Sequence, residues 1–178
     1  QVSSINNANI PYLVNGAAYY SQNDDRWART KYGDNFIGNN GCGPVTAAMF
    51  LSSILGKEVT PKETIDFAKK NNYFVKGGGT SEKFFKAVAN EYGTDVYKFK
   101  NKQLLKPSLQ AGYPVILSGK GGAPFTKDGH IVLATGLDKS GNVLINDPLN
   151  PNRNGAYKFK DVKKRTKMMW RVFDESTG

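Results

Sequence analysis

The sequence is poorest in the residues that bind transition metals and form disulfides. Its 178 residues include one cysteine, Cys42, and one histidine, His130. A single cysteine excludes an internal disulfide and a thiolate-rich zinc site, and a single histidine excludes the paired histidines of zinc peptidases. The oxygen-rich turns at 23–25 and 138–142 leave a calcium site open, although neither has the twelve-residue EF-hand pattern. We expect no obligatory metal and no other cofactor.

Long apolar runs are also missing. The two longest, at 45–55 and 131–137, fall short of the roughly 20 residues that a membrane-spanning helix needs. The chain begins Gln-Val-Ser-Ser, without the basic and apolar segments of a signal peptide. We therefore expect no membrane span. We predict one domain over residues 1–178, with a core of about 17–174, cut from a larger multidomain parent.

Acidic residues are few relative to basic ones. There are 25 Lys and Arg against 15 Asp and Glu, a formal net charge of +10. This excess attracts polyanions such as nucleic acids, acidic lipids or anionic cell-wall polymers. The basic residues are scattered, with neither an aromatic-interleaved RNA motif nor a helix-turn-helix pattern. We expect no nucleic-acid partner, and we keep anionic wall polymers and an ordinary solvated basic surface as alternatives. No apolar heptad indicates an oligomer, so a monomer is expected.

Helical patterns come first in the chain and strand patterns second. Pro44 and Gly56 delimit a first helix, and a capping box of Thr60 and Glu63 starts a second that runs to about Asn71. Further helices are predicted at 81–92 and 102–111. Strands are predicted at 114–118, 130–134, 142–146, 156–160 and 168–173. This order predicts an α+β domain in which a helical half packs against an antiparallel β-sheet.

Cys42 lies at the expected start of the first helix, in the segment Gly41-Cys42-Gly43-Pro44. The partial positive charge of a helix N-terminus lowers the pKa of a thiol and favours the reactive thiolate. Gly41 and Gly43 leave room for a substrate carbonyl, and the backbone N–H groups of this turn can bind an oxyanion. A lone cysteine is otherwise most often a small buried hydrophobe, so a catalytic role needs partners.

His130 and Asp147 supply such partners. His130 begins a predicted strand, which holds its imidazole in place as a base for Cys42, and Asp147 ends the next predicted strand. The turn at 138–141 makes the two strands a hairpin, so Asp147 is placed to orient His130. Asp128, two residues before His130, is the alternative orienting carboxylate. The glycine-rich loop 119–126 either borders the cleft or is a solvated hairpin loop.

Four segments together resemble the C39-like cysteine peptidases. They are Tyr20-Ser-Gln22 with Trp27, Gly38 with Gly41-Cys42-Gly43-Pro44, Gly129-His130, and Asn146-Asp147-Pro148, in the family's order of Gln, Cys, His and Asp. The resemblance implies a papain-like cysteine peptidase fold with Cys42 as nucleophile, His130 as proton carrier and Asp147 holding His130. It also implies that Gln22 donates its amide to the oxyanion, for which the alternative is an ordinary surface glutamine. We expect Gly41, Gly43 and Gly129 to contact the substrate.

Three functions remain open for such a site. In the first, which the +10 charge favours, an extracellular module of a phage or bacterial lytic protein, associated with the cell wall or a virion, cuts stem or cross-bridge peptides of peptidoglycan. The second is a leader-peptide or protein peptidase, and the third is a non-catalytic binding module of the same fold. A Cys-His-Asp site also serves other acyl chemistry, such as amidase, transglutaminase or deamidase reactions.

Overall fold

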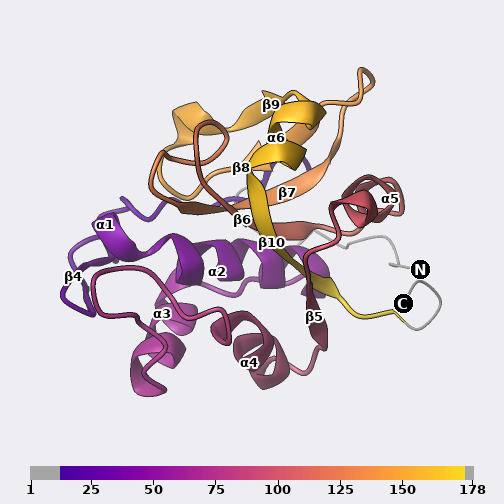
Figure 1. Ribbon diagram of the computed structural model, residues 1–178. Coiled ribbons are helices and arrows are strands. Elements are labelled where there is room, and N and C mark those ends of the chain that lie inside the picture. Colours follow the sequence, from indigo (N-terminus) through magenta and orange to yellow (C-terminus); the bar gives the residue numbers. More distant parts are fainter. Residues whose placement is uncertain (1–12, 175–178) are drawn as a thin grey trace.

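A six-stranded antiparallel sheet forms the centre of the protein in the computed structural model, which describes residues 13–174 (Figure 1). Every pair of neighbouring strands runs antiparallel. The last described strand, β10, lies inside the sheet, where it pairs with β5 on one side and with β6 on the other. The order across the sheet is β5 (Val96–Phe99), β10 (Thr166–Val172), β6 (Val115–Gly119), β7 (His130–Leu137), β8 (Val143–Asn146) and β9 (Gly155–Tyr157).

Helices cover both faces of this sheet. On one face lie α2 (Cys42–Leu55), α3 (Pro61–Lys70) and α4 (Phe84–Glu91), and on the other α5 (Leu105–Gln110) and α6 (Phe159–Arg165) (Figure 1). The shorter elements are the hairpins β1 (Leu13–Val14) with β2 (Ala17–Ala18) and β3 (Lys31–Tyr32) with β4 (Asn35–Phe36), the one-turn helix α1 (Ile37–Asn40), and the 3₁₀ turns η1 (Lys102–Leu104) and η2 (Pro151–Arg153).

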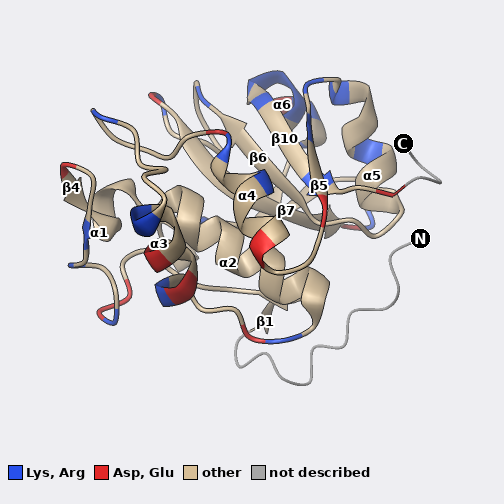
Figure 2. Ribbon diagram, turned by 90° about the horizontal axis from the view of Figure 1, so that it is seen from below, with Lys and Arg blue, Asp and Glu red and all other residues tan. Residues whose placement is uncertain are grey.

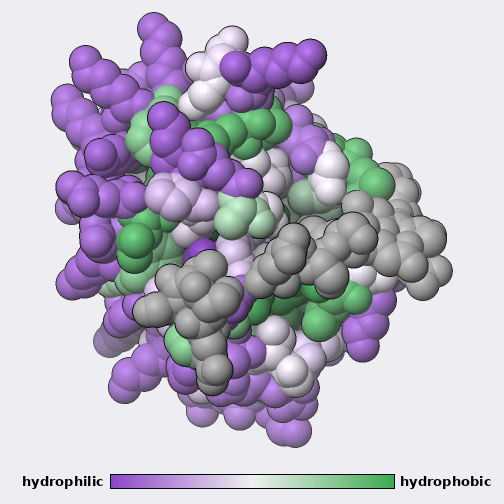
Figure 3. All heavy atoms as spheres, turned by 90° about the vertical axis from the view of Figure 1, so that its right-hand side faces the viewer, coloured by the Kyte–Doolittle hydropathy of each residue, from purple (hydrophilic) through white to green (hydrophobic). Residues whose placement is uncertain are grey.

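Two apolar cores follow from the alternation of side chains along the strands. In β10, Met168 and Trp170 pack with α2 and α4, whereas Met169 between them packs with α5 and α6. Both faces of the central strands are therefore buried, and this explains why these strands read as continuous apolar runs in the sequence. Hydrophilic side chains cover much of the surface seen in Figure 3, and hydrophobic ones form smaller patches. No helix within residues 13–174 is both long and apolar enough to span a bilayer.

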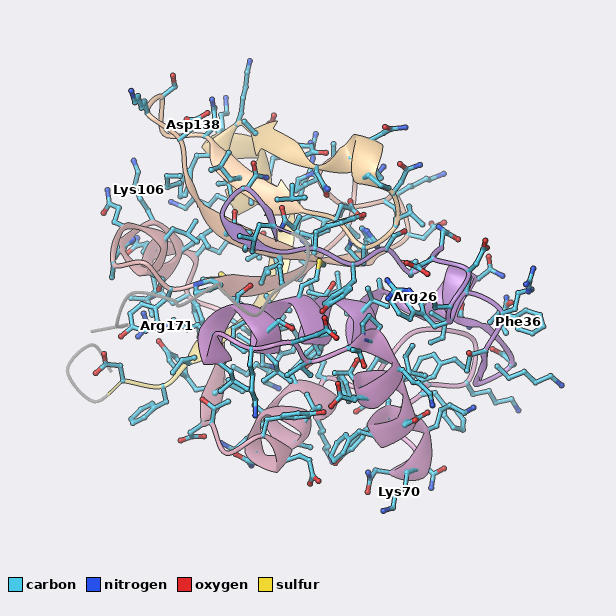
Figure 4. All side chains as sticks on the ribbon, turned by 180° about the vertical axis from the view of Figure 1, so that it is seen from behind. Arg26, Phe36, Lys70, Lys106, Asp138 and Arg171 are labelled. Carbon is cyan, nitrogen blue, oxygen red and sulfur yellow. The ribbon has the colours of Figure 1, made fainter. Side chains whose placement is uncertain are left out.

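Most of the predicted elements are present. The predicted helix before Gly56 is α2, which ends at Leu55 and is capped by Gly56 with φ +65°. The capping box of Thr60 and Glu63 at the start of α3 forms in both directions. The hairpin turn before β8 is held by the Asp138 carboxylate, which accepts hydrogen bonds from the backbone N–H groups of Ser140 and Asn142, both at 2.9 Å. Figure 4 shows Asp138 at the outer tip of this hairpin.

The predicted strand at 156–160 is wrong in its second half. Strand β9 ends at Tyr157, and Phe159 begins α6. Phe159 and Val162 lie about one helical turn apart, and both pack in the core beneath α5 and α6. The helical spacing of these two apolar residues therefore prevails over the local alternation of Tyr157 and Phe159. Strand β5 and the two N-terminal hairpins were not predicted.

Candidate active site

Cys42 is the first residue of α2, and close packing on both sides fixes its backbone. A Cβ atom at Gly41 would lie 2.6 Å from the carbonyl oxygen of Ile37, and one at Gly43 would lie 2.7 Å from Oγ1 of Thr80. The two glycines therefore let the turn before α2 approach the rest of the protein closely. Neither glycine lines the adjacent cavity, so their contact with substrate stays a prediction.

His130 is the first residue of β7 and is 7% exposed. Its Nε2 atom lies 2.7 Å from Oδ1 of Asp147, and its ring is also within hydrogen-bonding reach of the Cys42 thiol. Burial alone lowers the pKa of His130, but the hydrogen bonds and charges of Asp147 and Cys42 outweigh burial and raise this pKa to about 9. The imidazole is therefore protonated at neutral pH. The predicted pair of Cys42 and His130 comes together in space.

Asp147 follows β8 directly, and its side chain has no exposed surface. Besides His130, its Oδ1 atom accepts a hydrogen bond from the backbone N–H of Leu149 at 2.9 Å, and its Oδ2 atom accepts one from Nε of Arg153 at 2.8 Å. Burial raises the pKa of Asp147, but hydrogen bonds from these groups and the charge of His130 hold it below its ordinary value. Asp147 is therefore a buried carboxylate that stays ionised at neutral pH.

Arg153 is a part of the site that we did not predict. Its guanidinium links Asp147 to the loop before β7, because the terminal nitrogen also donates to the carbonyl oxygens of Pro124 and Phe125, at 3.2 and 3.3 Å. Arg153 lies in η2, six residues after Asp147. The sequence signal is only an arginine shortly after the Asp-Pro segment, and such a spacing occurs by chance in any basic chain.

Asp128, the alternative orienting carboxylate, does not hold the imidazole. The carboxylate that binds His130 is that of Asp147, through Nε2 of the ring. Asp128 is exposed and lines the cavity beside Cys42 instead.

Gln22 is buried beside α1, with 1% of its surface exposed, so the alternative of a surface side chain is wrong. Its Nε2 atom donates to the carbonyl oxygen of Gly38 at 3.0 Å, and its Oε1 atom is buried without a hydrogen-bond partner among the described residues. Gln22 does not line the cavity beside Cys42. Its role as oxyanion donor stays a prediction. Trp27 anchors this segment, because its indole N–H donates to the Ser21 carbonyl at 2.7 Å.

The cavity beside Cys42 has a volume of about 570 Å³. Its walls come from the end of α1 and the start of α2 (Asn39, Asn40 and Cys42), from a loop between α3 and α4 (Val75 and 77–80), and from β6 and the start of β7 with the two residues before it (Ser118 and 128–131). Gly129 is among them, and its contact with substrate stays a prediction. The glycine-rich loop at 119–126 is not part of the walls, because Phe125 draws it into the core with α5 and α6.

Three consecutive glycines at 77–79 form one wall of this cavity. All three have positive φ, from +88° to +114°, a backbone region that favours glycine. We predicted these residues only as a break between two helices. The triple glycine itself was the available signal for a special backbone path, although nothing local indicates that this path lies against Cys42.

Comparison with known proteins identifies the family of the chain. The Peptidase_C39 like family matches residues 14–177, which is most of the chain. The chain belongs to the Peptidase_C39 like family. It is thus a cysteine peptidase, as predicted from Cys42 and its partners. No curated protein matches the sequence.

Solved structures similar to this C39-like peptidase share its fold at low sequence identity. The peptidase domain of Streptococcus ComA, a bifunctional ABC transporter of a quorum-sensing pathway, gives a TM-score of 0.57 at 16% identity, covering 75% of this chain and 91% of that one. A protein described as a C39-like peptidase from Bacillus anthracis gives 0.56 at 17%, covering 88% and 94%. A double glycine motif protease from an AMS/PCAT transporter, in complex with the leader peptide, gives 0.55 at 18%, covering 74% and 84%. The predicted α+β, papain-like fold is confirmed.

Proposed function

We propose that this C39-like peptidase cuts peptide bonds with Cys42 as nucleophile, His130 as proton carrier and Asp147 as the residue that orients His130. One observation carries the proposal, namely that the Cys42 thiol lies beside the buried imidazole of His130, which is hydrogen-bonded to the buried carboxylate of Asp147. Because Nε2 of His130 is bound to Asp147, the other ring nitrogen is left for the thiol. The structure at 13–174 holds no cluster of three or more His, Cys, Asp and Glu that would bind a metal.

The proposed reaction is a two-step acyl transfer. The sulfur of Cys42 bonds to the carbonyl carbon, the C–N bond breaks, and His130 gives its proton to the leaving amine. Water then attacks the thioester while His130 takes one of its protons, and the C–S bond breaks, which releases the acid and restores the Cys42 thiolate beside protonated His130. The N–H of Cys42, at the free first turn of α2, is the oxyanion donor. Gln22 becomes a second donor if its side-chain N–H leaves the Gly38 carbonyl oxygen and donates to the oxyanion instead.

A protein or leader peptide is the substrate that we put first. The support is the similarity to peptidase domains of transporters, one of them solved with a leader peptide. The wall formed by 77–79 has no side chains, so an extended peptide can run along it beside Cys42. Peptidoglycan is the second candidate, and its support is the net charge of +10, which attracts anionic wall polymers. An extracellular location belongs to this second candidate.

Incubation with two kinds of substrate tests the proposal. Peptides that contain double-glycine sites and purified bacterial cell walls are each treated with wild type and with Cys42→Ala, and mass spectrometry identifies the new amino termini. Products made by wild type alone establish peptide-bond cleavage by Cys42, and their sequence decides between the two substrates. The proposal is wrong if a product forms equally with Cys42→Ala, or if Cys42 fails to react with iodoacetamide and nothing is cut.

A further inference from the structure

The charge of the cavity differs from the charge of the protein as a whole. The chain has ten more basic than acidic residues, and Figure 2 shows Lys and Arg along α6 and α5. Among the residues that the structure describes, no Lys or Arg lines the cavity beside Cys42. Apart from Cys42 and His130, Asp128 is the one ionisable side chain that residues 13–174 contribute to this lining. The cavity is therefore neutral to acidic in a basic protein.

The Asp128 carboxylate is free to bind a ligand. Its backbone is held in place, because the hydroxyl of Thr126 donates to the carbonyl of Gly129 at 2.7 Å and accepts from the Gly129 N–H at 3.2 Å. No hydrogen bond or ion pair within residues 13–174 involves the Asp128 side chain itself. By contrast, Asp24, Asp66 and Asp95 each pair with a Lys or Arg.

Neutral oxygen atoms line the cavity together with this carboxylate. Asn39, Asn40, Ser118 and Thr80 all contribute to its walls, and Oδ1 of Asn40 faces Gly78 across the loop 77–79. An ammonium group has three N–H donors and no acceptor, so a carboxylate with nearby amide and hydroxyl oxygens matches its needs. A substrate carboxylate in the same place would meet repulsion from Asp128.

We propose that Asp128 forms an ammonium-binding subsite and that the substrate carries an amine, either a lysine-type side chain or a free amino terminus, within about two residues of the bond that is cut. Asp128 and Cys42 line the same cavity of about 570 Å³, so an amine bound at Asp128 lies close to the bond that the thiol attacks. The inference rests on the proposed function, because it names the substrate class of the same site.

The first test needs no known substrate, because Cys42 is the only thiol in the chain. Three methanethiosulfonates of similar size, with a cationic, a neutral and an anionic head, are reacted with the protein at low salt. We expect the cationic reagent to modify Cys42 faster than the anionic one despite the net charge of +10. Asp128→Asn should lower the ratio of the two rates by about fivefold, an effect typical of an exposed charge that salt screens.

Asp66→Asn is the matched control, since it removes the same charge from α3, away from the cavity lining. The ratio should stay near the wild-type value in this variant. The inference is overturned if Asp128→Asn leaves the ratio unchanged, if both variants change it equally, or if the anionic reagent is faster in wild type. The neutral reagent shows whether Asp128→Asn has disturbed Cys42 itself.

The second test uses a peptide that the wild-type enzyme cuts. Paired versions carry lysine or the uncharged norleucine at each position within two residues of the bond. At one position wild type should prefer lysine by about fivefold in kcat/KM, and Asp128→Asn should remove that preference while Asp66→Asn keeps it. Equal rates for both peptides at every position overturn the inference. If no peptide is cut at all, the proposed function fails, whereas the thiol measurement still decides the charge of the subsite.

Discussion

Replacing Arg153 with methionine should loosen the carboxylate that orients His130. Nε of Arg153 lies 2.8 Å from Oδ2 of Asp147, whose side chain has no exposed surface. Methionine keeps much of the length and apolar bulk of arginine but has no N–H donor, so the Oδ2 atom loses its charged partner. We expect a less stable protein and a less rigidly held imidazole.

The size of the effect follows from the exposure of the two partners. Removing one partner of a fully buried ion pair costs about 3 to 5 kcal/mol, whereas exposed ion pairs contribute at most about 1 kcal/mol. The Arg153 side chain is 30% exposed, so water can replace part of its contact with Asp147. We therefore expect a loss of about 2 kcal/mol. In a chain of 178 residues this lowers Tm by about 4 to 8 °C.

Thermal and urea unfolding at pH 7 measure this loss. Arg165→Met is the control, because Arg165 donates to the Ala123 carbonyl on the same loop as Arg153 but does not bind Asp147. If Arg153 acted only by anchoring this loop, the two variants would lose similar stability. Equal losses in both, or no loss in Arg153→Met, would refute the reasoning.

The pH dependence of the same variant separates charge from packing. The pKa of Asp147 is held below its ordinary value of 3.8, so ionised Asp147 stabilises the fold above that pH, and this contribution is lost as the pH falls further. Arg153 is one cause of the lowered pKa. The difference in Tm between wild type and Arg153→Met should therefore shrink below about pH 4. A difference that is constant from pH 7 to pH 3 would indicate lost packing alone.

Three further variants test the surroundings of the site. Gly43→Ala places a Cβ atom 2.7 Å from Oγ1 of Thr80 and should cost about 1 to 3 kcal/mol in urea unfolding; the argument fails if the added Thr80→Gly change recovers none of this. Because the pKa of His130 is raised to about 9, its stabilising contribution is complete below about pH 6.5 and is lost as the pH rises through 9. Wild-type Tm should therefore fall more steeply between pH 7 and 10 than that of His130→Gln, and parallel curves would contradict this. Trp170→Ala removes a ring 4.5 Å from that of Phe85 in the core and should cost about 3 to 5 kcal/mol; a loss below 1 kcal/mol would show that the core collapses around the gap.

Local signals in the sequence predicted the helices and the central strands. The start and end of α2 depend on Pro44 and Gly56, and the start of α3 depends on a hydrogen-bonded box within four residues, so each is decided by near neighbours. The site residues could be predicted because the sequence has one cysteine and one histidine, and therefore only one possible Cys–His pair.

Contacts between distant segments account for what the sequence did not predict. The cavity places the loop 77–79 beside Cys42, although they are more than 30 residues apart, and α6 forms because Phe159 and Val162 bury against another layer. The direction of the Gln22 amide depends in the same way on a carbonyl oxygen of α1. The pattern of residues within one helix or strand does not indicate which distant segment it will contact.

The choice between Asp147 and Asp128 as the partner of His130 depends on a bulge in β7. Near the turn, Leu137 pairs with Val143, and this register alone would place Asp147 opposite Leu133. The register shifts by one residue between Ala134 and Gly136, so that Asn146 takes the place opposite Leu133. Because side chains alternate along a strand, the shift moves Asp147 from the face of Leu133 to the face of Val132 and His130. Gly136 within an apolar strand pattern was the one sequence sign of this bulge.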